Sequence, residues 1–243
     1  MRAHILCHVV ATASAITRTT VDVGRVSVTY DQHYFDTPVP QPRQGQRVAD
    51  RSGLRPWPCA VPLLQHLSEA TVPALETTLG RPPRVLELGS GVGLLGIGLA
   101  LATKAEVTLT DPGLPTRFSK GADSISTLEF LRRNVALNDA PTARAEKLLW
   151  GDADDLDAFR SEPPFDLVVA SEVLYEPSQY AALADTLAFF ATDAIIGYKV
   201  RHGREQTFFD RCADEHGFRV TSEPLAGEKL SKDAVLATLR RPK

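Results

Sequence analysis

An acidic residue followed by closely spaced glycines stands out between residues 85 and 96, in the run V-L-E-L-G-S-G-V-G-L-L-G. The apolar residues around Glu87 are typical of a central parallel strand, and three glycines at alternate positions let a ligand approach the backbone closely. A helix that begins near Val92 would point free N–H groups and its positive dipole end at that ligand. The run therefore predicts a strand, a turn and a helix that cradle a nucleotide-type cofactor.

The letters of this loop fit two cofactors. Gly91, Gly93 and Gly96 match the G-x-G-x-x-G pattern of nicotinamide dinucleotide sites, and Asp111 follows at the distance expected of a ribose-binding carboxylate. S-adenosylmethionine is the alternative. Glu87 favours it, because a carboxylate beside the loop attracts a cationic amine and repels a pyrophosphate. The loop taken alone leaves both cofactors open.

Strands and helices alternate regularly after the first 80 residues or so, which predicts a parallel sheet with helices on both faces. We expect strands at 84–88, 106–110, 144–149, 166–170 and 194–199, and helices at 92–103, 125–138, 155–160, 178–191 and 204–216. Two last strands, 218–222 and 235–240, have no helix between them and should pair antiparallel. Such an ending favours a methyltransferase over a nicotinamide enzyme.

The first 55 residues are expected to form an extension of the same domain, and residues 56–243 the methyltransferase domain itself. Alternating apolar residues between Val21 and Tyr30 predict a β-hairpin, and the Pro-, Gln- and Arg-rich stretch 38–51 predicts an exposed loop. Residues 1–21 lack acidic side chains, which is a faint transit-peptide composition, but two arginines are few for that role, and a frayed tail or an edge strand is the preferred interpretation.

Composition excludes several classes of protein. The 243 residues, 43% of them hydrophobic, suit one large domain. The net charge of −3 is not the positive charge typical of proteins that bind nucleic acid or an anionic membrane. No apolar run approaches the roughly 20 residues that span a bilayer. Three scattered cysteines and six histidines without metal-type spacing predict reduced thiols and no metal site. We expect a cytoplasmic monomer, with a mitochondrial location as the lesser alternative.

Several segments, taken in order, resemble methyltransferase family 16, the seven-β-strand protein-lysine methyltransferases, and within it the methyltransferase-like 21 group. The shared marks are Trp57 before the first helix, the loop Glu87 to Gly93, Asp111, the pair Trp150-Gly151, and Glu172-Val173-Leu174-Tyr175 after the fourth strand. The resemblance covers about two thirds of the chain. It implies a class I, Rossmann-like fold, S-adenosylmethionine as cofactor, and a lysine in a protein such as a chaperone or translation factor as acceptor.

The expected cofactor-binding residues follow from this resemblance and from side-chain chemistry. The Asp111 carboxylate can accept hydrogen bonds from both ribose hydroxyls, and the flat ring of Trp150 can stack on adenine. A solvated turn residue and a core tryptophan are the structural alternatives. Only the resemblance adds Trp57 and Ser171. The full set is Trp57, Glu87, Gly89, Ser90, Gly91, Gly93, Asp111, Trp150 and Ser171.

Glu172 and Tyr175 are the expected catalytic residues. Three positions apart in a turn or short helix, both can face one cleft, where the carboxylate orients an amine and the ring tolerates the cation formed on methylation. The structural alternative is that Glu172 caps a helix and Tyr175 packs. Arg201, after the fifth strand, is interpreted as a charge on the rim. The long connection 112–125 is either a substrate-contacting loop or a neutral insertion.

Other functions stay open at this point. The same fold serves many acceptors, so methyl transfer to another protein side chain or to a small-molecule amine is the first alternative. A nicotinamide oxidoreductase and a non-catalytic module that only binds the cofactor are the others.

Overall fold

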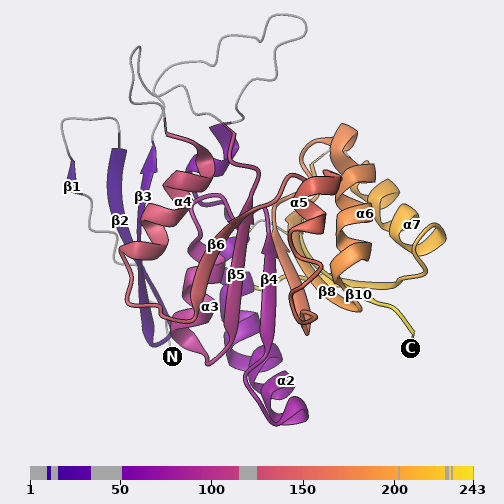
Figure 1. The fold of residues 1–243 in the computed structure, drawn as a ribbon, viewed down its shortest axis with the longest axis horizontal. Coiled ribbons are helices and arrows are strands. Elements are labelled where there is room, and N and C mark those ends of the chain that lie inside the picture. Colours follow the sequence, from indigo (N-terminus) through magenta and orange to yellow (C-terminus); the bar gives the residue numbers. More distant parts are fainter. Residues whose placement is uncertain are drawn as a thin grey trace, which may run out of the picture.

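Seven strands form a single sheet in the computed structural model, which describes residues 10–11, 16–33, 51–114, 125–201, 203–227, 230 and 232–242. In sheet order they are β6 (Ala143–Lys147), β5 (Glu106–Asp111), β4 (Arg84–Leu88), β7 (Leu167–Ser171), β8 (Asp193–Lys199), β10 (Ala234–Arg240) and β9 (Arg219–Pro224). The first five run parallel, and β10 is antiparallel to both of its neighbours (Figure 1). The expected class I α/β architecture is confirmed.

Burial on both faces explains why the central strands are apolar. Val85, Leu86 and Leu88 of β4 are buried, as is most of β7. From β4 the chain runs outward to β5 and β6, then returns to β7 on the other side of β4. Connections that diverge in this way leave a crevice at the carboxyl ends of the strands, where open α/β sheets bind their ligands.

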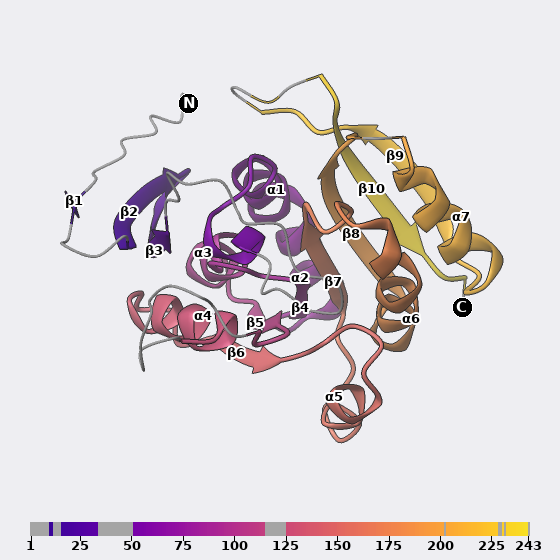
Figure 2. The same ribbon diagram turned by 90° about the horizontal axis from the view of Figure 1, so that it is seen from above.

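Helices cover both faces of the sheet (Figure 2). A separate hydrophobic cluster lies between the sheet and the helices on each face. One face carries α1 (Ala60–His66), the π-helical turn η2 (Leu67–Thr71), α2 (Val72–Leu79), α3 (Leu94–Ala102) and α4 (Thr127–Ala136). The other carries α5 (Ala153–Asp157), α6 (Tyr180–Phe190) and α7 (Glu205–Asp214). Within the described ranges, no helix is long and apolar enough to cross a membrane.

Some boundaries differ from those expected. Helix α3 begins at Leu94 rather than near Val92, because Gly93 has a positive φ of 87° and acts as its N-cap. The helix expected at 155–160 lies earlier, at 153–157, and the side chain of Asp152 caps it by accepting a hydrogen bond from the backbone N–H of Asp155, at 3.0 Å. Side-chain capping satisfies a donor that the first turn of a helix leaves free.

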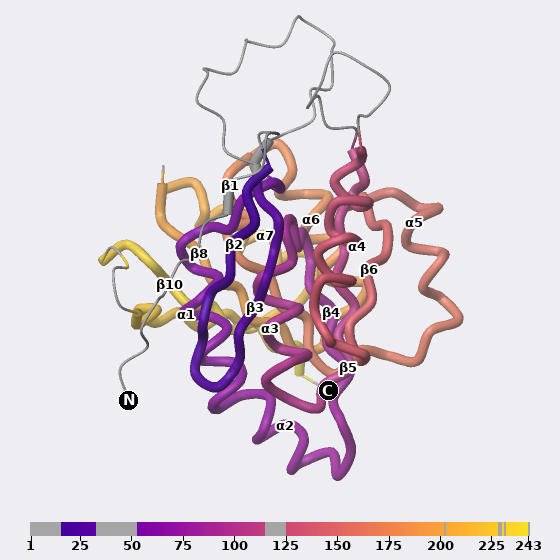
Figure 3. The backbone as a smooth tube through the Cα atoms, turned by 90° about the vertical axis from the view of Figure 1, so that its left-hand side faces the viewer, coloured from indigo at the N-terminus to yellow at the C-terminus, as the bar shows by residue number. Residues whose placement is uncertain are grey.

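The predicted N-terminal hairpin is present. Strands β2 (Ile16–Val23) and β3 (Val26–His33) pair antiparallel, and the short β1 (Val10–Ala11) extends them. Figure 3 shows the hairpin lying over α3 and α4, and Val21 and Val28 belong to the same hydrophobic cluster as α3. Of the segment 1–21, the described residues form β1 and the greater part of β2, which confirms the edge strand, while residues 1–9 and 12–15 lie outside the described residues. Residues 38–50 of the expected loop and residues 115–124 of the long connection also lie outside them.

Two asparagines of the α4 region hold the edge of β3 as a neighbouring strand would. Asn138 accepts a hydrogen bond from the N–H of Thr29 and donates to its carbonyl, at 2.9 and 2.7 Å. Asn134 makes the same pair with Asp31, at 2.8 and 3.1 Å, and also donates to the carbonyl of Val92 at 2.9 Å. The fully buried Asn134 therefore ties the hairpin to the loop before α3.

Replacing Asn134 with Ala should destabilise the protein by about 1–3 kcal/mol, because backbone groups of Asp31 and Val92 would lose their hydrogen-bond partner. Chemical denaturation monitored by circular dichroism measures the change in the free energy of unfolding. The exposed neighbour Arg133→Ala serves as control and should change it by less than about 0.5 kcal/mol. Equal effects of the two substitutions would contradict the assigned role of Asn134.

Candidate active site

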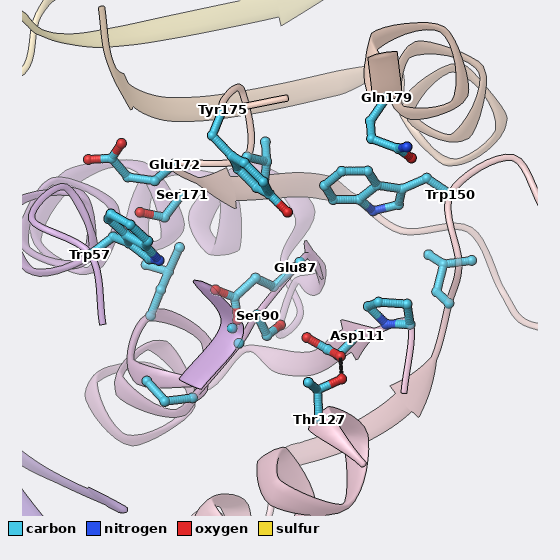
Figure 4. A pocket seen from close by; sticks show the side chains of 18 of the residues that line it. Trp57, Glu87, Ser90, Asp111, Thr127, Trp150, Ser171, Glu172, Tyr175 and Gln179 are labelled. Carbon is cyan, nitrogen blue, oxygen red and sulfur yellow. Dashed lines mark hydrogen bonds between the residues drawn. The ribbon is translucent and has the colours of Figure 1, made fainter. Parts of the chain in front are cut away.

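A cavity of about 590 Å³ opens at the carboxyl ends of β4, β5 and β7. Figure 4 shows Asp111 and Trp150 on one side of it and Trp57 and Glu172 on the other, with Glu87 and Ser90 between them. The lining includes all but one of the residues expected to bind cofactor or take part in catalysis. Gly93 is the exception, since it faces α4, where an added Cβ would lie 2.7 Å from Leu131.

The glycine loop is held by contacts that leave no space for side chains. Gly89 has a φ of 68°, and a Cβ there would lie 3.0 Å from the Trp150 ring. Gly91 has a φ of 54°, and a Cβ there would lie 3.0 Å from the carbonyl oxygen of Gly53. Both positions favour glycine for conformation and for space. The loop thus passes between Trp150 and the 3₁₀ turn η1 (Arg51–Leu54).

Glu87 is buried below this loop, with 2% of its surface exposed. Its carboxylate accepts a hydrogen bond from the backbone N–H of Gly96, at 3.1 Å. Burial raises its pKa to about 7, although hydrogen bonds from Ser90 and Gly96 oppose the rise. At neutral pH the carboxyl is thus only partly ionised. Its repulsion of a pyrophosphate is weaker than the sequence argument assumes, and part of its role is to fix the loop.

Asp111 ends β5 at the edge of the cavity and is 4% exposed. The alternative of a solvated turn residue is therefore wrong. Its carboxylate accepts hydrogen bonds from the Thr127 hydroxyl and from the N–H of Gly113. Burial raises the pKa of Asp111, and the hydrogen bonds from Thr127, Gly113 and Gly91 oppose that rise. The carboxylate is oriented before any ligand arrives.

Trp150 lies three residues beyond the end of β6, with its ring beside Gly89. It also packs against the hydrophobic cluster beneath α5 and α6, so the core interpretation and the cavity interpretation both hold. Its indole Nε1 and the hydroxyl of Ser171 are buried without a hydrogen-bond partner. Buried polar groups in this state are rare in native proteins and are typical of a binding site.

Trp57 lines the cavity from the segment before α1 rather than only packing at the helix entry. The guanidinium groups of Arg55 and Arg201 lie over its ring, with Cζ 4.4 and 5.1 Å from the ring centre. Such cation–π contacts hold a ring in one orientation. Trp57 therefore lies at the wall of the cavity, and its contact with the cofactor stays a prediction.

Glu172 and Tyr175 both line the cavity, as the sequence predicts. Tyr175 is 39% exposed, and in Figure 4 its hydroxyl points toward the middle of the cavity. The Glu172 side chain is 1% exposed, and its carboxylate points away from the middle of the cavity. There its Oε2 accepts a hydrogen bond from Nη2 of Arg201 at 2.6 Å. Among the helices that the structure describes, none is capped by Glu172. Its φ of 59°, unusual for a non-glycine residue, carries the chain sharply out of β7.

Sequence reasoning missed three contributors. Arg201 is more than a charge on the rim, because it pairs with Glu172 and lies over Trp57. Gly53 lies against Gly91, and Thr127 orients Asp111. The family resemblance includes a basic residue near position 201, but no local pattern marks the other two, whose partners are far away in sequence.

The residues present fit S-adenosylmethionine. The glycine turn leaves room for a ligand against the backbone, Asp111 offers an oriented carboxylate, and the unpartnered Nε1 of Trp150 and Oγ of Ser171 offer hydrogen-bonding atoms. The described residues contain no group of three or more side chains suited to hold a metal ion.

Several known proteins are similar to part of this sequence. Human histone-arginine methyltransferase METTL23 is 33% identical over 136 residues, which are 55% of this chain and 60% of the relative. Mouse protein N-lysine methyltransferase METTL21A is 30% identical over 159 residues, 63% of each chain. Mouse EEF1A lysine methyltransferase 3 is 30% identical over 180 residues, 70% of this chain and 67% of the relative. The chain spans about half to two thirds of the length of such relatives.

A solved structure shares the fold. The putative transferase PH0793 from Pyrococcus horikoshii superposes with a TM-score of 0.54 at 17% identity, over 95% of this chain and 74% of its own. The model of a protein family described as lysine methyltransferase matches residues 43–215, the greater part of the chain. These residues contain the glycine loop, Asp111, Trp150 and the Glu172 turn. The chain therefore belongs to the lysine methyltransferase family, whose cofactor is S-adenosylmethionine.

Proposed function

We propose that this protein transfers a methyl group from S-adenosylmethionine to the ε-amine of a lysine side chain in another protein. One observation carries the proposal: a single cavity joins the glycine loop and Asp111 to the turn that bears Glu172 and Tyr175. The first group of residues suits a nucleoside with an amino-acid tail, and the second suits an incoming amine. Membership of the lysine methyltransferase family supports the same acceptor.

The proposed reaction requires a neutral amine, because only that form has a free lone pair. With a reference pKa near 10.4, deprotonation of lysine at pH 7 costs about 4.6 kcal/mol, at roughly 1.36 kcal/mol per pKa unit. When bound, S-adenosylmethionine supplies the methyl group on a positively charged sulfur. Partial burial of the amine beside such a cation favours loss of its proton. The chain then has to align the reacting atoms and keep water out.

The side chains of the turn after β7 suit that work. Tyr175 presents an aromatic face that can tolerate the methylated cation, and it is exposed enough for an acceptor to reach. Glu172 acts indirectly, since its carboxylate is buried, points away from the middle of the cavity and is paired with Arg201. We therefore propose that Glu172 shapes and polarises the acceptor end, and that no strong general base takes part.

Arginine is the second candidate acceptor. The relative that is 33% identical is named a histone-arginine methyltransferase, so acceptor choice differs among similar chains. Lysine takes precedence because the matching family is described as lysine methyltransferases, and METTL21A and EEF1A lysine methyltransferase 3 are named for lysine. We propose a protein partner, either a translation factor, which the name EEF1A lysine methyltransferase 3 supports, or a chaperone, which the family resemblance implies.

We further infer that the hairpin and the sheet form one domain, since they share a hydrophobic cluster. A reducing compartment, the cytoplasm, suits Cys59 and Cys212, which are buried free thiols. A monomer that acts without nucleic acid completes the proposal.

Replacing Asp111 with Ala should weaken S-adenosylmethionine binding about tenfold or more, because the oriented hydrogen-bond acceptor is lost. Isothermal titration calorimetry gives the dissociation constant. Asp154→Ala, an exposed acid on α5 outside the cavity, is the matched control and should bind normally. An unaltered dissociation constant for the Asp111 variant would remove Asp111 from the cofactor site.

Cofactor binding should depend on pH through Glu87. Without cofactor its carboxyl, with a pKa near 7, is largely protonated at about pH 6 and largely ionised at about pH 8. A cationic amine nearby attracts the ionised form, so binding should tighten as the pH rises across this window. In Glu87→Gln that part of the dependence should vanish, while titration of the cofactor itself affects both proteins alike. Identical pH profiles would refute the assignment.

Methyl transfer can be followed with a cell lysate, recombinant protein and S-adenosylmethionine labelled in its methyl group. Hydrolysis of the labelled proteins, with separation of methyllysine from methylarginine, identifies the acceptor. We expect methyllysine. Glu172→Ala should lose most transfer and still bind cofactor, because it disturbs only the acceptor end, whereas the exposed control Glu223→Ala should be unaffected. Label in arginine would select the second candidate, and label only in small molecules would refute both.

A further inference from the structure

Arg201 is held at three points beside the acceptor end of the cavity. Its backbone N–H donates to Oε1 of Glu205, the buried first residue of α7, at 2.8 Å. Its guanidinium donates through Nη2 to Oε2 of Glu172 at 2.6 Å. The same guanidinium lies over the Trp57 ring, 5.1 Å from its centre. The residue is therefore fixed in backbone and in side chain.

The two side chains that Arg201 touches both line the cavity, whereas Arg201 lies behind them. Glu172 belongs to the turn after β7, and Trp57 comes from the segment before α1, more than a hundred positions away. Arg201 bridges these segments. Arg55 also lies over Trp57, whereas the Glu172 carboxylate accepts its hydrogen bond from Arg201. Of the two guanidinium groups, that of Arg201 is the one that joins the ring to the carboxylate.

A guanidinium group suits this bridge better than an ammonium group does. It is planar, so its edge can bond a carboxylate while its face lies on an aromatic ring. A lysine at this position would keep the charge and lose the combination. The carboxylate of Glu172, in turn, depends on its partner. A buried carboxylate without a compensating charge is strongly destabilised and would move or take up a proton.

We propose that Arg201 is a positioning residue for methyl transfer. Its guanidinium group holds the Glu172 carboxylate and the Trp57 ring in the places where they form the wall of the acceptor end. Tyr175 stands on the same turn as Glu172, so its placement depends on the same bond. The proposal rests on the function proposed above and adds to it the residue that sets the geometry of the acceptor end.

The structure also offers a chemical test. The Arg201 side chain is 31% exposed, so truncating it leaves a guanidinium-sized space that is open to solvent and bounded by Glu172 and Trp57. A free guanidinium ion can enter such a space and restore the lost contacts. An ammonium ion of similar charge lacks the planar shape and should restore much less.

The experiment measures transfer of label from S-adenosylmethionine into lysate protein by the full chain, over a range of cofactor concentrations. Arg201→Ala should lower the maximal rate about 10- to 100-fold, as misplaced reacting groups do. Arg201→Lys should recover little of it. Guanidinium chloride, far below denaturing concentrations, should raise the rate of Arg201→Ala and leave the wild type unchanged, while methylammonium chloride should not. Arg204→Ala, an exposed arginine three positions on, is the matched control and should behave as wild type.

A second readout is independent of activity. The chain contains two tryptophans, Trp57 and Trp150. In a Trp150→Phe background the fluorescence of Trp57 alone is observed, and Arg201→Ala should shift its emission toward that of a more mobile, solvated indole. Guanidinium should reverse the shift. Thermal unfolding of each variant shows whether it is folded.

The outcomes separate the two proposals. Wild-type rate and unchanged Trp57 emission in Arg201→Ala would overturn the positioning role and leave the proposed function intact. A folded but slow Arg201→Ala that guanidinium does not restore would also overturn it. If that variant fails to fold, Arg201→Lys decides, since a wild-type rate there shows that charge alone is enough. Absence of transfer by the wild type would refute the proposed function itself.

Discussion

The parallel pairing of β4 with both β5 and β7 is the constraint on which the site depends. It sets Glu87 beside Leu109 on one side and Leu88 beside Ala170 on the other. Because the carboxyl ends of paired parallel strands lie at the same edge of a sheet, the glycine loop, Asp111 and Ser171 lie close together at that edge although they are distant in sequence. The connections after β4 and β7 lead to opposite faces, which leaves the space between them open for a ligand.

Three carboxyl groups are buried around that space, and each has partners that stabilise it. Glu87 and Asp111 each accept hydrogen bonds from a hydroxyl and from backbone N–H groups, whereas Glu172 is paired with a full positive charge. Burying an acid is costly unless such partners are supplied. In the proposed function the three have separate roles: Glu87 fixes the loop, Asp111 binds the nucleoside, and Glu172 organises the acceptor turn with Arg201 and Trp57.

The sequence predicted what depends on local pattern. Apolar runs gave the strands in the right order, the missing crossover gave the antiparallel hairpin, and nearly all of the residues that the motifs single out line the cavity. Gly93 shows the limit of a motif. It matches the glycine pattern of a cofactor loop, but in the structure it is the N-cap of α3 and lies near Leu131. Asn134 shows another limit, since nothing in its neighbourhood on α4 indicates that its amide bonds a strand from the N-terminal hairpin.

The sequence by itself determined the fold class, the cofactor loop and the turn that carries Glu172 and Tyr175, because these depend on periodicity and on spacing within short segments. Only the tertiary structure decided which way the Glu172 carboxylate points and what it binds. That choice depends on Arg201 reaching both Glu172 and Trp57 at one end of the sheet. Burial decides the charge and partner of an acid, and burial is a property of the packed molecule that no local run of residues contains.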